Sequence, residues 1–257
     1  MSRMKDISDA TVQIILDDLR RQAAEATTLQ DSAQRFMESF RASVADSVIL
    51  ARTYATVPFG ILPARDRAFV EQVARSKDQV RLLTDETQTL SLLGTSGIEP
   101  AWCDRYRSKD HLGIPLLSQE FVSGIPMVAG LIRQLGAAKA WFAGLHQPQH
   151  NNNFGVFAES FFIRDAGGSR DSEGRLLIPA REFVRDYQIG TVLGVGGQFA
   201  STGMILVCIF FTRETLDFTP RWLVRVPLLL GTATLALVSS GKVYASSASD
   251  QPSPQGA

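Results

Sequence analysis

The stretch TVLGVGGQFASTGMILVCIFFTRE, residues 191–214, decides the fold of this chain. Two runs rich in β-branched and aromatic residues are separated by ASTG, residues 200–203. Such runs favour strands, and a short turn containing glycine between two of them is typical of an antiparallel hairpin. The sequence therefore predicts a β-hairpin over this stretch.

Strand and helix patterns alternate on either side of the hairpin. Three further runs have the composition of strands, at residues 47–57, 89–97 and 154–166. Helical spacing and terminal signals predict helices at residues 61–77, between an N-cap at Ser118 and a stop at Gly136, and at residues 181–190 and 219–240. Pro126 should kink or split the second of these helices. Each element must bury an apolar face, so we expect an α+β fold with a central antiparallel β-sheet covered by helices from both chain ends.

The N-terminal region has a helical apolar pattern with seven-residue spacing. The repeating positions are Val12, Leu19, Ala26, Ala33 and Phe40, with Leu16, Ala23 and Met37 on the adjacent line. One long amphipathic helix or two would give this pattern. Packing on the chain's own domain and a two-stranded dimer seam explain it equally well. We expect an N-terminal helix at 1–40, a main domain at 41–242 and a disordered tail at 243–257.

Composition and charge exclude several classes of protein. Hydrophobic residues make up 45% and charged residues 20%, as in ordinary globular domains. The 26 basic and 26 acidic residues cancel, so no global field favours nucleic acid. The N-terminus lacks a signal-peptide core, and the apolar stretches at 203–211 and 226–241 are shorter than the roughly 20 residues that cross a bilayer. We therefore expect a cytoplasmic protein without a membrane or nucleic-acid partner.

An ordered series of segments resembles the GAF family over about residues 35–242. YQIGTVLGVGGQFASTGMILVCIFFTRETLDFTPRWL is similar to the C-terminal half of a GAF domain, and FFIRDAGGSRDSEGR is similar to the strand and loop before it. The resemblance implies a sensory domain of the kind that precedes histidine kinases and cyclases in bacteria. It also implies a ligand pocket between the sheet and the helices around residues 155–190. Ligands of the family range from cyclic nucleotides to tetrapyrroles, and the fold does not choose among them.

The loop EPAWCDRYRSKDHLGIPL, residues 99–116, resembles a Glu-Pro-x-Trp-Asn-Asp-Arg loop of GAF-like input domains, with Cys103 in place of the usual Asn. No kinase or cyclase module follows in the sequence, so we expect the output to pass through a signalling partner or a conformational change. The candidate ligand-binding residues are Trp102, Asp104, Arg105, His111, Phe157, Asp165 and Tyr187.

Structural roles compete with ligand binding at these positions. We favour a clasp for the loop, in which Asp104 and Arg105 cap backbone groups and Trp102 covers the edge of the core. Core packing also explains Phe157 and its aromatic neighbours better than a cofactor pocket does, because strand residues alternate between faces.

Motifs for catalysis and for metal binding are weak. Cys103 and the three histidines, His111, His146 and His150, match no paired zinc-ligand spacing, whereas haem with one axial His111 or Cys103 stays open. GVGG at 194–197 precedes a turn and a strand, unlike a phosphate loop that opens a helix. No nucleophile elbow or catalytic triad is evident.

The sequence therefore predicts a non-enzymatic, homodimeric sensory or regulatory domain that has no metal site and binds a small ligand or a signalling partner. The alternatives are a structural or protein-interaction module whose pocket its own side chains fill, and a haem-binding sensor.

Overall fold

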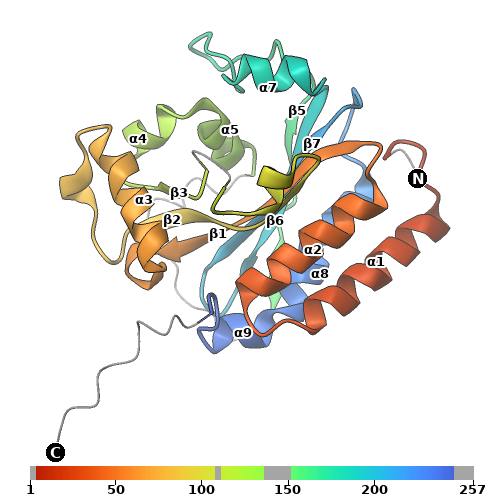
Figure 1. Ribbon diagram of the computed structural model, residues 1–257, viewed down its shortest axis with the longest axis horizontal. Coiled ribbons are helices and arrows are strands. Elements are labelled where there is room, and N and C mark those ends of the chain that lie inside the picture. Colours follow the sequence, from red (N-terminus) through yellow and green to blue (C-terminus); the bar gives the residue numbers. More distant parts are fainter. Residues whose placement is uncertain (1–3, 108–110, 136–151, 246–257) are drawn as a thin grey trace, which may run out of the picture.

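A computed structural model describes residues 4–107, 111–135 and 152–245 of the chain. It shows an antiparallel sheet with helices on both faces (Figure 1), and the predicted α+β fold is confirmed. The strands are β1 Val48–Pro58, β2 Gln88–Gly97, β3 Gly113–Pro115, β4 Phe154–Val156, β5 Phe161–Ile163, β6 Thr191–Phe199 and β7 Ile205–Thr212. The α-helices are α1 Asp9–Ala24, α2 Leu29–Ser43, α3 Ala64–Arg75, α4 Gln119–Ser123, α5 Pro126–Gln134, α7 Arg181–Asp186, α8 Arg225–Ala233 and α9 Leu235–Ser239. Short 3₁₀ helices are η1 Phe59–Ile61, η2 Val80–Leu82, η3 Pro100–Cys103 and η4 Arg221–Val224.

The strands follow the order β3-β2-β1-β7-β6-β4, and β5 also pairs with β6. The predicted hairpin is present as β6 and β7, in register from Thr191 opposite Thr212 to Gln198 opposite Ile205. Beyond the residues that pair with β3, backbone groups of β2 on that same edge form hydrogen bonds with a side chain of α2. Thr95 donates its backbone N–H to Gln34 Oε1 at 3.0 Å, and Gln34 Nε2 donates to the Thr95 carbonyl at 2.9 Å.

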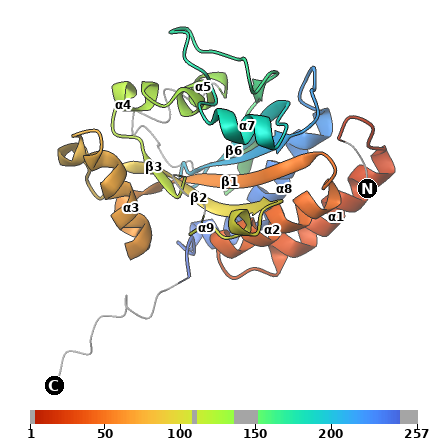
Figure 2. The ribbon, with the colours of Figure 1, turned by 45° about the horizontal axis from the view of Figure 1, so that its top comes forward.

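Side-chain alternation along β7 divides the core into two parts. Leu206, Cys208 and Phe210 face a cluster that includes the buried residues of α1, α2 and α8. Val207 and Ile209 face the other cluster, with residues of α4, α5 and α7. Helices α1, α2 and α8 thus lie on one side of the sheet and α4, α5 and α7 on the other (Figure 2). Because both faces are covered, all eight residues of β7 are buried.

The N-terminal pattern forms two helices, and Thr28 caps the second through its hydroxyl, which accepts from the backbone N–H of Asp31 at 3.1 Å. Both helices pack inside the chain's own core. The buried positions include Val12, Leu16, Leu19, Ala23, Ala33, Met37 and Phe40. Intrachain packing therefore accounts for the seven-residue spacing, and α1 and α2 share the core of the main domain.

Three predicted elements are divided in the structure. The expected strand at 154–166 consists of β4 and β5, and the expected helix at 219–240 consists of η4, α8 and α9. Thr234 leaves helical geometry between α8 and α9, and its hydroxyl donates to the Leu230 carbonyl at 2.7 Å. The split at Pro126 is confirmed, since this residue begins α5. No helix in the described ranges combines the length and apolar composition that a membrane span requires.

The last described residues are docked on the domain. The carbonyls of Lys242 and Val243 accept hydrogen bonds from the backbone N–H groups of Leu29 and Gln30, at 2.9 and 3.0 Å. These donors lie at the start of α2, where a helix has no internal acceptors. Val243, at the start of the predicted tail, thus contacts the start of α2, and residues 246–257 of that tail lie outside the described residues.

The contact between α2 and β2 depends on Gly94. A Cβ atom at this position would lie 2.4 Å from the carbonyl oxygen of Ala33 in α2, so Gly94→Ala must push the helix away from the sheet. We expect a loss of about 1–3 kcal/mol in the free energy of unfolding, the usual effect of overpacking, measured by urea denaturation. Gly155→Ala is the matched control, because its Cβ would meet no atom within 4 Å. Equal urea midpoints for the two variants would contradict this close approach.

Candidate functional site

The predicted clasp is formed around Arg105. Its guanidinium pairs with Asp66 of α3, and its Nε donates to the Leu92 carbonyl of β2 at 2.8 Å. The side chains of this pair are only 4% and 1% exposed. The rings of Tyr106 and Tyr244 lie 4.8 and 5.8 Å from the guanidinium carbon. Burial raises the pKa of Asp66, and the charge of Arg105 opposes that shift.

The three candidate residues Asp104, Arg105 and His111 differ in exposure. Asp104 is exposed and uses Oδ1 to accept the backbone N–H of Tyr106 at 2.9 Å. His111 is also exposed, whereas Arg105 is buried in the clasp. Asp104 and Arg105 therefore have the backbone and packing roles that the clasp interpretation predicts.

Both cysteines are free, and both thiols contact polar groups of the fold. The Cys103 thiol donates to the Gly97 carbonyl at 3.4 Å. Burial raises the pKa of Cys208 to about 12, so this side chain is a neutral thiol at physiological pH. Within the described ranges, no three His, Cys, Asp or Glu side chains are grouped to hold a metal ion. His146 and His150 lie outside those ranges.

Two candidate residues do come together, in an aromatic cluster made of Trp102, Phe183, Tyr187 and Phe211. The Trp102 ring lies 4.6 Å from that of Tyr187 and 5.5 Å from that of Phe183. The Tyr187 hydroxyl donates to Glu99 Oε1 at 3.2 Å. Partial burial and the charge of Glu99 raise the pKa of Tyr187. The cluster thereby fastens α7 to the loop at 99–107.

The other side of α7 faces an open cavity of about 440 Å³, which we term the arginine depression. Its lining residues are Gly167, Arg170, Leu176, Ile178, Arg181, Val184 and Arg185. Arg181 and Arg185 are four residues apart, so they project from the same side of the helix. Phe183 and Tyr187, also four apart, project toward the aromatic cluster. One short helix thus separates an aromatic contact from a charged cavity.

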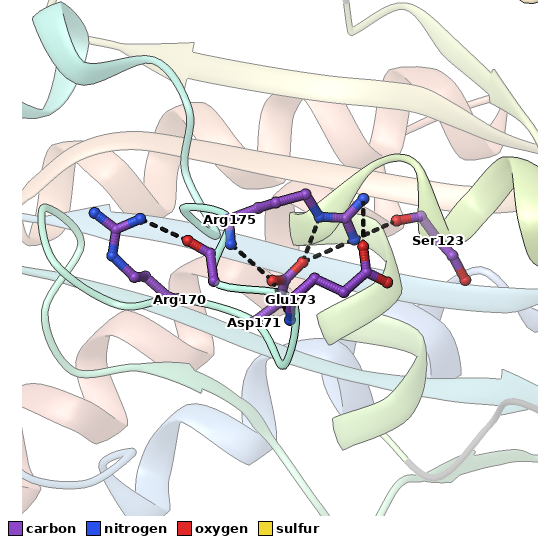
Figure 3. A network of polar contacts seen from close by, with 6 residues as sticks. Ser123, Arg170, Asp171, Glu173 and Arg175 are labelled. Carbon is purple, nitrogen blue, oxygen red and sulfur yellow. Dashed lines mark hydrogen bonds and ion pairs between the residues drawn. The ribbon is translucent and has the colours of Figure 1, made fainter.

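The loop that carries Arg170 is held by hydrogen bonds within the loop and to α4 (Figure 3). Asp171 accepts the backbone N–H groups of Glu173 and Arg175, each at 2.9 Å. The Arg175 guanidinium bonds Asp171 Oδ2 and the Ser123 carbonyl of α4, both at 2.8 Å. Burial alone would raise the pKa of Asp171, but the hydrogen bonds from Arg175 and Glu173 lower it below its usual value.

The remaining candidate residues, Asp165 and Phe157, have structural contacts. Asp165 Oδ1 accepts the backbone N–H of Gly167 at 3.0 Å, an Asx turn at the start of the loop. Phe157 is half-buried and packs against the core on the α4 and α5 side of the sheet, as the core-packing interpretation predicts.

Sequence reasoning missed the arginines of the depression. The spacing of Arg181 and Arg185 is visible in REFVRD, but their meeting with Arg170 depends on how the loop folds back.

Comparisons with known proteins give limited matches. No protein-family model and no curated protein matches the chain. Among solved structures, it is similar to the GAF domain of an Acinetobacter phosphoenolpyruvate-protein phosphotransferase, with 14% identity, 91% of this chain and 97% of that chain covered, and a TM-score of 0.47. It is also similar to a phycoerythrobilin-bound GAF domain from a cyanobacterial phytochrome, with 9% identity, coverage of 91% and 98%, and a TM-score of 0.44. A third similar structure is a phycocyanobilin-bound GAF domain from a cyanobacterial phytochrome, with 10% identity, 89% of this chain and 94% of that chain covered, and a TM-score of 0.43.

All three are GAF domains, the family that the sequence resembles. At such identities and TM-scores the likeness carries no conclusion about a ligand or an activity. The kinase and cyclase context stays a prediction.

The clasp predicts a large effect of removing one charge. Asp66→Ala leaves the Arg105 guanidinium buried without its carboxylate, and we expect a loss of about 3–5 kcal/mol in the free energy of unfolding. Asp104→Ala changes an exposed residue next to Arg105, and it should lower the free energy of unfolding by about 1 kcal/mol or less. The double replacement Asp66→Leu with Arg105→Met should recover much of the stability, because no buried charge is left. Urea denaturation measures all three, and a small effect of Asp66→Ala would contradict the clasp.

The braced loop predicts a pH dependence. The pKa of Asp171 is lower in the folded protein than its unfolded value near 3.8. The hydrogen bonds of its carboxylate therefore stabilise the fold fully at a pH above 3.8, and this stabilisation is lost as the pH falls through the lower pKa of the folded state. In an NMR titration, the backbone amides of Glu173 and Arg175 should shift with a midpoint below 3.8. Asp171→Asn should abolish this titration. A midpoint at or above 3.8 would contradict the bracing.

Proposed function

We propose that this domain is a non-catalytic sensory or regulatory module that binds a small ligand on the side of the sheet carrying α4, α5 and α7. The observation that carries the proposal is the open arginine depression of about 440 Å³ beside α7. The volume is within the range of small-molecule sites. It also falls within residues 155–190, where the resemblance to GAF domains implies a pocket.

A ligand in the depression would act through the position of α7. A ligand changes a conformation only if it binds one arrangement more tightly than another. Val184 and Arg185 contact the depression, and Phe183 of the same helix contacts Phe211 of β7 at 5.4 Å between ring centroids. Phe210, which is next to Phe211 in β7, contacts Phe40 of α2 on the opposite face of the sheet, with 4.5 Å between ring centroids. Displacement of α7 would therefore alter packing on both faces.

The second candidate is an interaction module without a ligand. It is favoured by the packing of Trp102 against Tyr187 and Phe183, in which the chain's own aromatic rings contact one another. A haem-binding sensor is the remaining alternative, with His111 or Cys103 as the axial ligand. The hydrogen bond from Cys103 to Gly97 occupies that thiol, and an ultraviolet–visible spectrum of the purified protein tests for haem directly.

The proposal includes a cytoplasmic location in a bacterial cell, a homodimeric state and a signalling protein as the recipient of the output. Cys103 and Cys208 are both free thiols, which fits a reducing compartment. The apolar residues of the expected seam are buried within the chain, so a dimer through α1 would use its outer face, where Ile14 is 70% exposed.

Native mass spectrometry and hydrogen exchange test the proposal together. We expect a small molecule to be retained by the purified protein, and its removal to lower the protection of amides in α7 and α2. Phe183→Leu should preserve binding while abolishing the change in α2, because it removes the contact with Phe211. Phe218→Leu is the matched control at a 71% exposed phenylalanine and should behave like the wild-type protein. Saturating ligand with unchanged protection in both helices would argue against a sensory role.

A further inference from the structure

The arginine depression combines positive charge with an apolar surface. Its lining divides by chemistry: the guanidinium groups belong to Arg170, Arg181 and Arg185, and the apolar surface belongs to Leu176, Ile178 and Val184. None of its seven lining residues is acidic. All three arginines are exposed, whereas Ile178 and Val184 are buried and form a floor.

The positive charges around the depression are only partly compensated. Arg185 donates from Nε to Asp186 Oδ1 at 2.7 Å, in an exposed ion pair. Arg170 donates from Nη1 to the Gly174 carbonyl at 2.6 Å, and a carbonyl carries no net charge. Within the described part of the chain, the Arg181 guanidinium makes no hydrogen bond and no ion pair. Two of the three guanidinium groups are therefore without a carboxylate from the described residues.

We propose that the arginine depression binds a small organic oxyanion, a phosphate or carboxylate that also carries an apolar portion. The planar guanidinium groups of Arg170 and Arg181 match the geometry of such an oxyanion and bond it through several N–H groups. The apolar portion lies against Ile178 and Val184. This inference rests on the proposed function and names the ligand class of the same site.

The surroundings position the backbone segments that carry the arginines. Arg170 extends from the loop that Asp171 and Arg175 brace against Ser123 (Figure 3). Arg181 and Arg185 come from one helix, α7, which the aromatic cluster fixes from its other side. Preorganised donors lose less conformational entropy when they bind. Another cavity among the described residues, of about 500 Å³, has a different lining, with Asp78 beside Arg75 and Arg81 and a single apolar side chain, Val80, among these four.

Phenyl phosphate is the probe that combines both features, and its binding is followed by NMR chemical shifts. Inorganic phosphate supplies the charge alone, phenol supplies the ring alone, and benzoate replaces phosphate by carboxylate. We expect saturable shifts that are largest for residues 167–185, with phenyl phosphate or benzoate bound more tightly than inorganic phosphate or phenol. Whichever of phenyl phosphate and benzoate binds more tightly identifies the oxyanion that the site prefers. Added salt should weaken binding, because the arginines are exposed.

Arg181→Gln is the decisive variant, since the Arg181 guanidinium makes no hydrogen bond or ion pair with the described residues that the substitution could break. It should weaken binding of the preferred probe about tenfold, the factor that one charge-assisted hydrogen bond supplies. Arg20→Gln is the matched control, because it removes the same charge from an exposed arginine of α1 on the other side of the sheet. Equal affinities of Arg181→Gln and the wild-type protein would overturn the inference, as would saturable shifts that leave residues 167–185 unaffected, or no saturable shifts with either phenyl phosphate or benzoate.

Two results separate this inference from the proposed function. If native mass spectrometry finds a neutral retained molecule, and neither oxyanion probe binds, the oxyanion inference fails while the sensory proposal stands. If phenyl phosphate binds through Arg181 and the protection of α2 does not change, the oxyanion site stands and the sensory proposal fails.

Discussion

The central strands must be covered on both faces, and the rest of the structure follows from this constraint. Every residue of β7 is buried, and so is every residue of β1 except Pro58. Strands of this kind are stable only between two layers of helices. The helices near the chain termini supply one layer, and the short helices of the middle segment supply the other. The candidate site lies in the second layer, where the helices are short and the loops are long.

The short length of α7 makes the geometry of the candidate site depend on side-chain packing. A helix of six residues has little stability of its own, so its position depends on side-chain packing. The aromatic cluster holds one side of α7 through Trp102, and the arginine depression lies on the other. Any molecule that contacts Val184 or Arg185 therefore acts on a helix whose place is set by a few rings.

The sequence predicted the hairpin, the strands β1 and β2 and the break at Pro126, because composition and proline geometry are local properties. It could not divide the run at 154–166 into β4 and β5, since a continuous aromatic composition hides a bend. Trp102 and Tyr187 were chosen as candidates, but their contact joins positions 85 residues apart and arises only from the sheet order. The arginines were missed for a similar reason: Arg170 meets Arg181 only after the intervening loop turns back.

The amide of Gln34 has a consequence for how the protein behaves at high concentration. Open sheet edges invite strands from other molecules and lead to aggregation. Here β3 is three residues long and ends in Pro115, and Gln34 occupies the donor and acceptor of Thr95 farther along the same edge. The opposite edge at β4 is also only three residues long. Intermolecular strand addition is therefore disfavoured at both ends of the sheet, and self-association of this domain is left to the surfaces of its helices.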